Sequence, residues 1–349
     1  MGIASTPSRV DRRGVVVGSI LVVLVLIGVY IGSSGLQWFD PALAPYLFGT
    51  VLAVFATAYR YIVWLRRPPT AMLNSRGWEA MRAKGRRGSN AVGLVGKLVN
   101  NILLQRFIAG RSKVRWVAHQ LLFWGCVLAA LVTFPLTFGW LHFESADESG
   151  RLYEAFLGPF ATIQFDSRGF FGFMVFHLLN IAAFLVIAGV AIFLIRRMRD
   201  RGAIALERAS DFAPLVGLFA VSITGLMLTA SSLWMGGQFY AFITNLHALT
   251  VILGLLYIPF GKLFHIFQRP ANIGVSFYKE AAEATGEQTC IQCGEGFASV
   301  LQMEDLKAVL PAVGFDYSFE SGEHYQDVCP KCRRRVVGLA QVARVGGFG

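Results

Sequence analysis

The sequence has few charged residues for its length, and acidic residues are the scarcer kind. Only 15% of its 349 residues are charged, with 21 acidic against 32 basic side chains, whereas soluble domains carry roughly 25% charged residues. Hydrophobic residues make up 55% of the chain and the mean hydropathy is +0.54. This balance excludes an ordinary soluble domain as the main part of the chain and indicates that lipid is its main solvent.

Motifs of soluble catalysis are also missing. The sequence has no Gly-rich nucleotide-binding motif and no recognisable nucleophile constellation, so a catalytic centre is expected on another subunit. Cysteine is scarce, at five residues, and four of the five form two C-x-x-C pairs, which does not suggest a disulfide framework. The net charge of +11 does not require nucleic acid, because the basic residues cluster between apolar runs as they do in cytoplasmic loops.

Five apolar runs predict six transmembrane helices, because each span needs about 20 residues. The runs cover residues 14–39, 41–65, 116–141, 169–195 and 212–261. The last run is too long for one span, and the Met235-Gly236-Gly237-Gln238 stretch divides it into a hairpin of two helices. Arg60, near the end of the second run, is placed to snorkel towards the interface. The first run is longer than the apolar core of a signal peptide, which favours a retained helix.

The loops predict the orientation of these spans. Residues 66–115 contain twelve Lys or Arg and one acid, whereas residues 142–168 contain five acids and two arginines. Lys and Arg stay inside, so we expect both termini and the basic loop to be cytoplasmic, in the inner membrane of a prokaryote. Apolar residues at helical spacing within residues 91–108 predict an amphipathic helix, which either lies at the interface or packs on the protein.

The C-terminal tail carries a candidate metal site. Cys290 and Cys293 form one C-x-x-C pair, and Cys329 and Cys332 form the other. Four thiolates in two such pairs favour a tetrahedral site for zinc or for a single iron, with a redox dithiol as a further alternative. The fold expected from the sequence is therefore all-α, a six-helix transmembrane bundle with a small zinc-ribbon-like domain at residues 286–337. The remaining domains are 1–65 (two helices), 66–115 (basic loop) and 116–272 (four helices).

Four histidines lie in or at the ends of the predicted spans: His119, His177, His247 and His265. Ionisable residues are costly within a membrane and mark functional sites, and neutral imidazole is a standard axial ligand of haem iron. His247 and His265 are eighteen residues apart, which is five turns of one straight helix or roughly 27 Å. This spacing predicts ligands for two haems, one in each leaflet.

Each of these two histidines then needs a partner at a similar depth. His119, just inside the cytoplasmic end of its span, is predicted to pair with His265, and His177 with His247. A hydrogen-bonded core histidine is the plain alternative for any single residue. His142 is the substitute ligand if a pairing fails, and a quinone-site or surface role is also open to it. His324 and Cys126 are expected to be a surface residue and a packing residue.

With these residues in hand, the sequence resembles a known family, the dihaem cytochrome b membrane subunits related to the respiratory nitrate reductase gamma subunit. The membrane subunits of heterodisulfide reductase and dissimilatory sulfite reductase complexes belong to the same group. The resemblance covers about residues 94–272. It rests on the segments Leu103-Leu104-Gln105-Arg106, His119-Gln120-Leu121-Leu122-Phe123-Trp124-Gly125, Asp211, Ile223-Thr224-Gly225, His247-Ala248-Leu249 and Ile258-Pro259-Phe260-Gly261-Lys262-Leu263-Phe264-His265.

The resemblance implies two haems b, a quinone or quinol as substrate, and cytoplasmic iron–sulfur and catalytic partners, which contain molybdenum in the nitrate reductase case. The family carries a second ligand ten residues after the one that matches His119, and here that position is Ala129. His177 is therefore expected to replace it. The direction of electron flow is left open by the sequence. The alternative is a membrane transporter or scaffold that docks a partner through the zinc ribbon and holds no haem.

Overall fold

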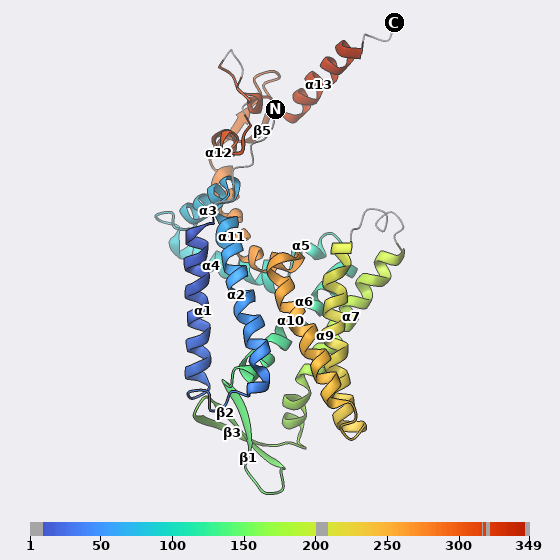
Figure 1. The fold of residues 1–349 in the computed structure, drawn as a ribbon. Coiled ribbons are helices and arrows are strands. Elements are labelled where there is room, and N and C mark those ends of the chain that lie inside the picture. The colour runs from blue at the N-terminus through green and yellow to red at the C-terminus, as the bar shows by residue number, and fades with distance from the viewer. Residues whose placement is uncertain (1–9, 200–208, 316, 319–321, 346–349) are drawn as a thin grey trace. The chain divides into compact units, whose positions relative to one another are not determined.

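The computed structural model describes residues 10–199, 209–315, 317–318 and 322–345, which are mostly helical (Figure 1). The chain divides into two compact units, described separately below. The span unit comprises Met1–Val63 and Val99–Phe267, and the cysteine unit comprises Trp64–Leu98 and Gln268–Gly349. Residues 200–208, between the predicted spans at 169–195 and 212–261, lie outside the described residues, as do residues 1–9, 316, 319–321 and 346–349.

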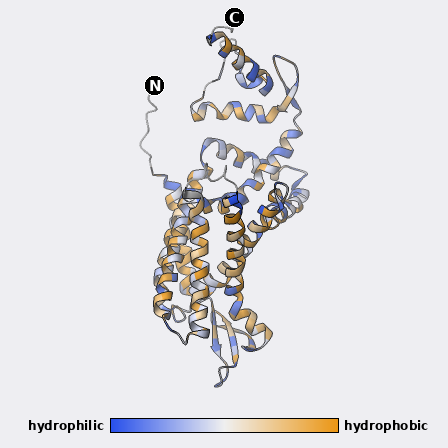
Figure 2. Cartoon of the chain, turned by 90° about the vertical axis from the view of Figure 1, so that its right-hand side faces the viewer, coloured by the Kyte–Doolittle hydropathy of each residue, from blue (hydrophilic) through white to orange (hydrophobic). Residues whose placement is uncertain are grey.

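Six helices are long and apolar enough to cross a membrane, as a multi-pass membrane protein requires. They are α1 (Arg12–Gly32), α2 (Ala44–Leu65), α6 (Lys113–Thr137), α7 (Phe170–Arg199), α9 (Ala209–Trp234) and α10 (Tyr240–Phe260). Figure 2 shows hydrophobic residues concentrated along these helices. The predicted break in the longest apolar run is confirmed, because α9 ends and α10 begins on either side of residues 235–239.

Small residues allow these helices to approach closely. A Cβ added to Gly125 on α6 would lie 2.7 Å from Val186 of α7, and one added to Gly189 on α7 would lie 2.8 Å from the Ala118 carbonyl oxygen of α6. Such positions bring helix backbones together in lipid, where packing rather than hydrophobicity drives association. α7 packs in turn against α9, and α9 against α10.

The two N-terminal helices join this arrangement through the same kind of contact. Gly14 and Gly18 of α1 lie against the rings of Tyr59 and Phe55 on α2. Gly49 of α2 lies against α10, where an added Cβ would be 3.4 Å from Ile252. α2 therefore contacts α10, the helix that carries His247.

The acidic loop is a small sheet, which the all-α expectation missed. Strands β1 (Leu141–Ser145), β2 (Leu152–Leu157) and β3 (Phe160–Asp166) form an antiparallel sheet in that order. Trp140 fixes it to α1 by donating its indole N–H to the Gly28 carbonyl, 2.9 Å away. Figure 1 shows the sheet at one end of the spans, which we call the sheet end.

The prediction that His247 and His265 share one straight helix is wrong. α10 ends at Phe260, the turn η3 (Lys262–Phe264) follows, and His265 begins a new helix, α11 (His265–Glu283). Gly261 has extended backbone angles, and a Cβ there would lie 2.2 Å from the ring of Tyr257. Glycine at this position leaves room for the Tyr257 ring over the break. His247 and His265 are therefore not five turns apart on one helix.

The cysteine unit joins two regions that the sequence placed in separate domains. Its elements are α3 (Pro68–Met81), α4 (Arg87–Leu98), most of α11, β4 (Glu287–Thr289), β5 (Gly296–Ser299), α12 (Val300–Val309) and α13 (Pro330–Val345), with turns η4 (Pro311–Val313) and η5 (Tyr325–Asp327). Gly77 of α3 meets Gly274 of α11 so closely that a Cβ on Gly77 would lie 2.8 Å from the Gly274 carbonyl oxygen. The basic loop and the tail thus fold together.

The amphipathic helix predicted over residues 91–108 is three pieces. α4 ends at Leu98, a π-helical turn η2 (Val99–Leu103) follows, and α5 (Arg106–Ala109) begins after Gln105, whose φ of +48° interrupts the helix. Within the cysteine unit, Lys97 of α4 lies over the ring of Phe277 on α11. Val92 and Val95 remain exposed. The contact with Phe277 is consistent with a helix packed on the protein, and the exposed valines are consistent with a helix at the membrane interface.

Candidate metal centre and histidine sites

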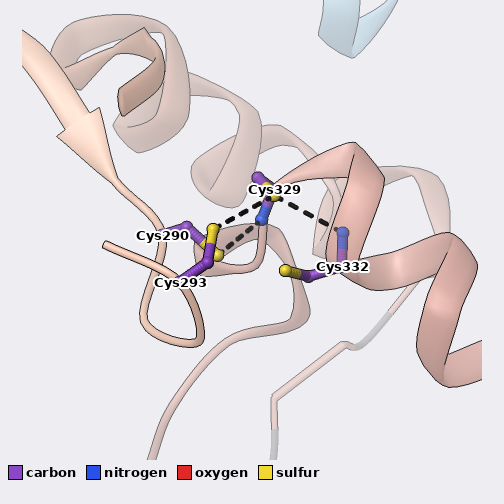
Figure 3. A group of neighbouring side chains, drawn as sticks. All are labelled: Cys290, Cys293, Cys329 and Cys332. Atoms are coloured by element: carbon purple, nitrogen blue, oxygen red, sulfur yellow. Dashed lines mark hydrogen bonds between the residues drawn. The ribbon is translucent and has the colours of Figure 1, made fainter. Parts of the chain in front are cut away.

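The four tail cysteines come together in one cluster, as the sequence predicts (Figure 3). Their sulfur atoms all lie within 4.8 Å of one another, and the Cys293 and Cys329 sulfurs are 3.8 Å apart. A tetrahedral zinc–thiolate site with bonds of about 2.3 Å places its sulfurs about 3.8 Å apart. The donor set and its size therefore fit a zinc or single iron ion.

Local structure explains why these cysteines converge. Cys290 and Cys293 lie in the turn between β4 and β5, and Cys329 and Cys332 lie at the start of α13. Backbone N–H groups point at the sulfurs: the Cys329 N–H lies 3.2 Å from the Cys290 sulfur, and the Cys332 N–H lies 3.4 Å from the Cys329 sulfur. One hairpin and one helix start thus hold the cluster.

The same hydrogen bonds set the acidity of the thiols. Burial raises the pKa of Cys290, but three backbone N–H groups, that of Cys329 first, outweigh burial and lower the pKa to about 6. A hydrogen bond with Cys329, followed by burial, raises the pKa of Cys332 to about 12. One thiolate therefore forms readily and further ones are costly, which a bound dication would reverse by favouring all four thiolates.

His247 on α10 is oriented by α9. Its Nδ1 lies 2.9 Å from the Thr224 hydroxyl oxygen, and that hydroxyl lies 2.7 Å from the Ala220 carbonyl, to which it can donate its own proton. Thr224 then accepts the Nδ1 proton of His247, which leaves Nε2 with its lone pair. Gly225 leaves room for the imidazole, because a Cβ there would lie 3.4 Å from its Cε1.

His177 and His265 have the same arrangement with backbone partners. The Nδ1 of His177 lies 3.1 Å from the Phe173 carbonyl oxygen, and the His177 ring stacks on the Phe173 ring at 4.2 Å. The Nδ1 of His265 lies 2.6 Å from the Lys262 carbonyl oxygen. A carbonyl only accepts hydrogen bonds, so Nδ1 carries the proton and Nε2 keeps its lone pair in both residues.

His119 lies near the start of α6, half-buried, with a buried Nδ1. It follows Ala118, which is fully buried where α6 meets Gly189 of α7. The chain before α6 is fixed to it, because Trp116 donates its indole N–H to the Leu104 carbonyl at 2.7 Å. The pairing of His119 with His265 stays a prediction.

The helices that carry His177 and His247 both flank α9. Asn180, three residues after His177, accepts a hydrogen bond of 2.8 Å from Thr229 of α9, and Thr224 of the same helix contacts His247. Thr224 and Thr229 are five residues apart, or about 7.5 Å along the helix axis. Both histidines therefore lie beside the half of α9 nearer the hairpin with α10, and their pairing stays a prediction.

A groove between α9 and α10 connects the surroundings of two of these histidines. Its volume is about 390 Å³ and its lining extends from Thr250, three residues after His247, to Leu263, two residues before His265. Gly217 and Gly254 line it, and a Cβ added to either would meet no atom within 4 Å. Side-chain-free backbone of this kind suits a flat ligand lying close to the helices, and the volume is in the usual range for ligand pockets.

A larger apolar cavity of about 680 Å³ lies at the sheet end. The last turns of α6, the first turns of α7 and one face of the sheet enclose it, with Leu136, Phe143 and Val175 among its lining residues. Thr162 lines it too, but its hydroxyl donates to the Ala155 carbonyl at 2.6 Å. The cavity therefore offers space for hydrocarbon rather than for a polar group.

The two remaining histidines and Cys126 are held by packing or by local hydrogen bonds. His142 lies on β1 between the rings of Trp38 and Phe156, at 4.2 Å and 5.0 Å, so both faces of its ring are covered. It lies on a strand rather than in a span, which disfavours it as a substitute haem ligand. His324 accepts the Gln326 N–H at 3.0 Å and caps η5. Cys126 packs in the apolar core of the span unit, as predicted.

Sequence reasoning missed the residues that orient the candidate ligands. Thr224 belongs to the family-like segment Ile223-Thr224-Gly225, but its position 23 residues before His247 gives no sign of contact. A hydroxyl inside an apolar span was the one signal available, because such groups need partners in lipid.

Comparison of the chain with protein-family models, with curated proteins and with the solved structures gave no match.

Proposed function

We propose that the chain is the membrane cytochrome b subunit of a respiratory oxidoreductase complex, passing electrons between the quinone pool and cytoplasmic iron–sulfur and catalytic partners. The observation that carries this proposal is that three histidines in or next to the spans have the same hydrogen-bonding arrangement. In His177, His247 and His265, an oxygen atom engages Nδ1 and leaves Nε2 for a ligand. Metal-binding histidines almost always have this arrangement.

The surroundings of these histidines are consistent with haem as the ligand. The glycine-lined groove between α9 and α10 gives room for a flat group near His247 and His265. When bound, haem b supplies one-electron oxidation and reduction at its iron. The chain's own contribution is to orient the imidazoles, to exclude water with apolar helices and to hold the two ligand sets apart along the spans.

Quinone is the lipophilic reactant that the family resemblance implies. The cavity at the sheet end is lined almost entirely by apolar residues and would accept the hydrocarbon part of such a molecule. The four-cysteine cluster would contribute a metal-stabilised surface for a soluble partner. The alternative, a membrane transporter or scaffold that docks a partner through the cysteine cluster, differs from this proposal in holding no haem.

Spectroscopy of the purified full-length protein tests the proposal. We expect a b-type α-band in the reduced-minus-oxidised spectrum and two extractable haems for each chain. His247→Ala should remove one haem and leave the other, whereas His142→Ala, a matched control on β1, should leave both. Absence of haem from the wild-type protein would overturn the proposal. Loss of both haems or neither on replacing His247 would contradict the assignment of ligands.

A further inference from the structure

The turn that presents His265 is held by a residue from outside the family-like region. Arg60 of α2 donates a hydrogen bond from Nη1 to the carbonyl oxygen of Pro259, in the last turn of α10. Its guanidinium carbon also lies 4.2 Å from the centroid of the Phe264 ring. Arg60 therefore contacts the chain on both sides of the break between α10 and His265.

The break needs such support because the helix gives up its own hydrogen bonds there. Carbonyls in the last turn of a helix have no partner within the helix, and Arg60 supplies a charged donor to one of them. Phe264, under the guanidinium, is only 3% exposed. The next residue is His265, whose Nδ1 is bonded to Lys262 within the same turn. The position of the imidazole thus depends on a turn clamped from α2.

Arg60 is exposed, so its positive charge is available to a further partner. Within the described part of the chain, no carboxylate forms an ion pair with Arg60, and one of its five N–H donors is used on Pro259. A positive charge at the end of a membrane span is costly unless it is neutralised or reaches water. A carboxylate held beside His265 could accept from the remaining guanidinium N–H groups, and the two propionates of a haem are such carboxylates.

We propose that Arg60 is a positioning residue for the His265 ligand site and the anchor for a carboxylate of the group bound there. This inference rests on the proposed haem function. It gives the N-terminal helix pair, an addition to the family-like region, a role in the electron-transfer site. Arg60 acts through two separable properties: a hydrogen bond to the Pro259 carbonyl and a positive charge next to the bound group.

Three variants of the full-length protein separate these properties. Arg60→Gln keeps an N–H donor and loses the charge, Arg60→Lys keeps the charge, and Arg60→Met loses both. A nearby positive charge favours reduced haem, so Arg60→Gln should shift the midpoint potential of one haem to a more negative value. Arg60→Lys should restore most of that shift. Arg12→Gln, at the start of α1, serves as the matched control and should leave both potentials unchanged.

Hydrogen exchange provides a readout that does not depend on haem. Arg60→Met should accelerate exchange of the Gly261 and Phe264 amides, which bond to Tyr257 and Gly261, while amides in α6 keep their rates. Unchanged exchange at this turn would overturn the positioning role, and unchanged potentials in Arg60→Gln would overturn the charge role. A wild-type protein without haem would instead overturn the proposed function, and the exchange comparison would still decide whether Arg60 holds the turn.

Discussion

Thr224 joins the backbone of α9 to the imidazole of His247. Its hydroxyl can donate to the Ala220 carbonyl while its oxygen accepts from His247 Nδ1, and it lies 3.3 Å from the Thr250 hydroxyl. Thr250 is itself bonded to the His247 carbonyl at 2.8 Å. The two threonines therefore fix both the tautomer and the rotation of the imidazole before any ligand binds.

Replacing the Thr224 hydroxyl with a methyl group should weaken haem binding at His247 without leaving a cavity. Thr224→Val keeps the shape of the side chain but cannot accept the Nδ1 proton, so the haem bound by His247 should be held about 10–100-fold more weakly. Haem content after dialysis against a haem-binding competitor measures this. Thr229→Val, which loses only its bond to Asn180, is the control. Equal haem retention in both variants would remove Thr224 from the site.

At the scale of elements, a buried carboxylate connects three helices of the cysteine unit. Asp305 on α12 accepts from Arg76 of α3 at 2.8 Å and from the Tyr278 hydroxyl of α11 at 2.9 Å. Asp305 is 4% exposed, and hydrogen bonds to charged groups are stronger than those between neutral ones. α3, α11 and α12 are thus joined at one point.

Asp305→Asn should therefore loosen the whole cysteine unit. The asparagine amide removes the negative charge and places its own N–H against either Arg76 or Tyr278, both of which are donors. We expect the free energy of unfolding of the cysteine unit to fall by about 1–3 kcal/mol. The cost should lie in the lower part of this range because the Arg76 side chain is 39% exposed and water screens it. Denaturant-dependent hydrogen exchange of α3 and α12 in the full-length protein measures the change, and Glu304→Gln, at the exposed neighbouring position, is the control.

The same network should also make the stability of the cysteine unit depend on pH in the alkaline range. Burial, and then the hydrogen bond to Asp305, raise the pKa of Tyr278 to about 12. A pKa raised on folding means that the stabilisation is complete below about pH 10, the ordinary pKa of tyrosine, and is lost as the pH rises through 12. Tyr278→Phe should abolish this dependence. A cysteine unit whose stability is flat between pH 9 and 12 would exclude the network as its source.

The spans could be predicted from the sequence because a run of apolar residues in lipid leaves only one solution, a helix whose backbone satisfies itself. The cysteine cluster could be predicted because two C-x-x-C pairs are typical of a tetrahedral metal site. The break before His265 could not be predicted, since proline and glycine also occur within continuous spans, as Pro135 and Gly125 do in α6. The sheet at 141–166 was missed because its strands are short and their alternation is weak. Contacts such as Arg60 with Pro259 join residues 199 positions apart, and no local pattern encodes them.

At the scale of the whole molecule, the chain keeps its two kinds of candidate site in separate units. The four predicted haem-ligand histidines belong to the span unit, and the four clustered cysteines belong to the cysteine unit. Disturbing one set should therefore leave the other intact, which gives a clean way to assign each cofactor.

Replacing Cys290 with serine should remove one equivalent of zinc or iron and leave the haem spectrum unchanged. The Cys290 sulfur accepts a backbone N–H and sits among three other sulfurs, so its loss should also raise hydrogen exchange between β4 and α13. Elemental analysis of the purified protein measures the metal and identifies it. Cys126→Ser, in the span unit, is the control. An unchanged metal content would exclude the cluster as a metal site.

The cysteine unit is made of two stretches of chain, one before and one after the last four spans. During synthesis, α3 therefore leaves the ribosome long before α11 and α12, its partners. At 5–20 residues each second, the intervening chain takes roughly 10–35 s to make. Throughout that interval Gly77 of α3 lacks its contact with Gly274, and Arg76 lacks its partner Asp305. A ribosome stalled after the last span would thus leave a membrane-inserted chain whose soluble part is unfinished, a state that chaperones and proteases can recognise.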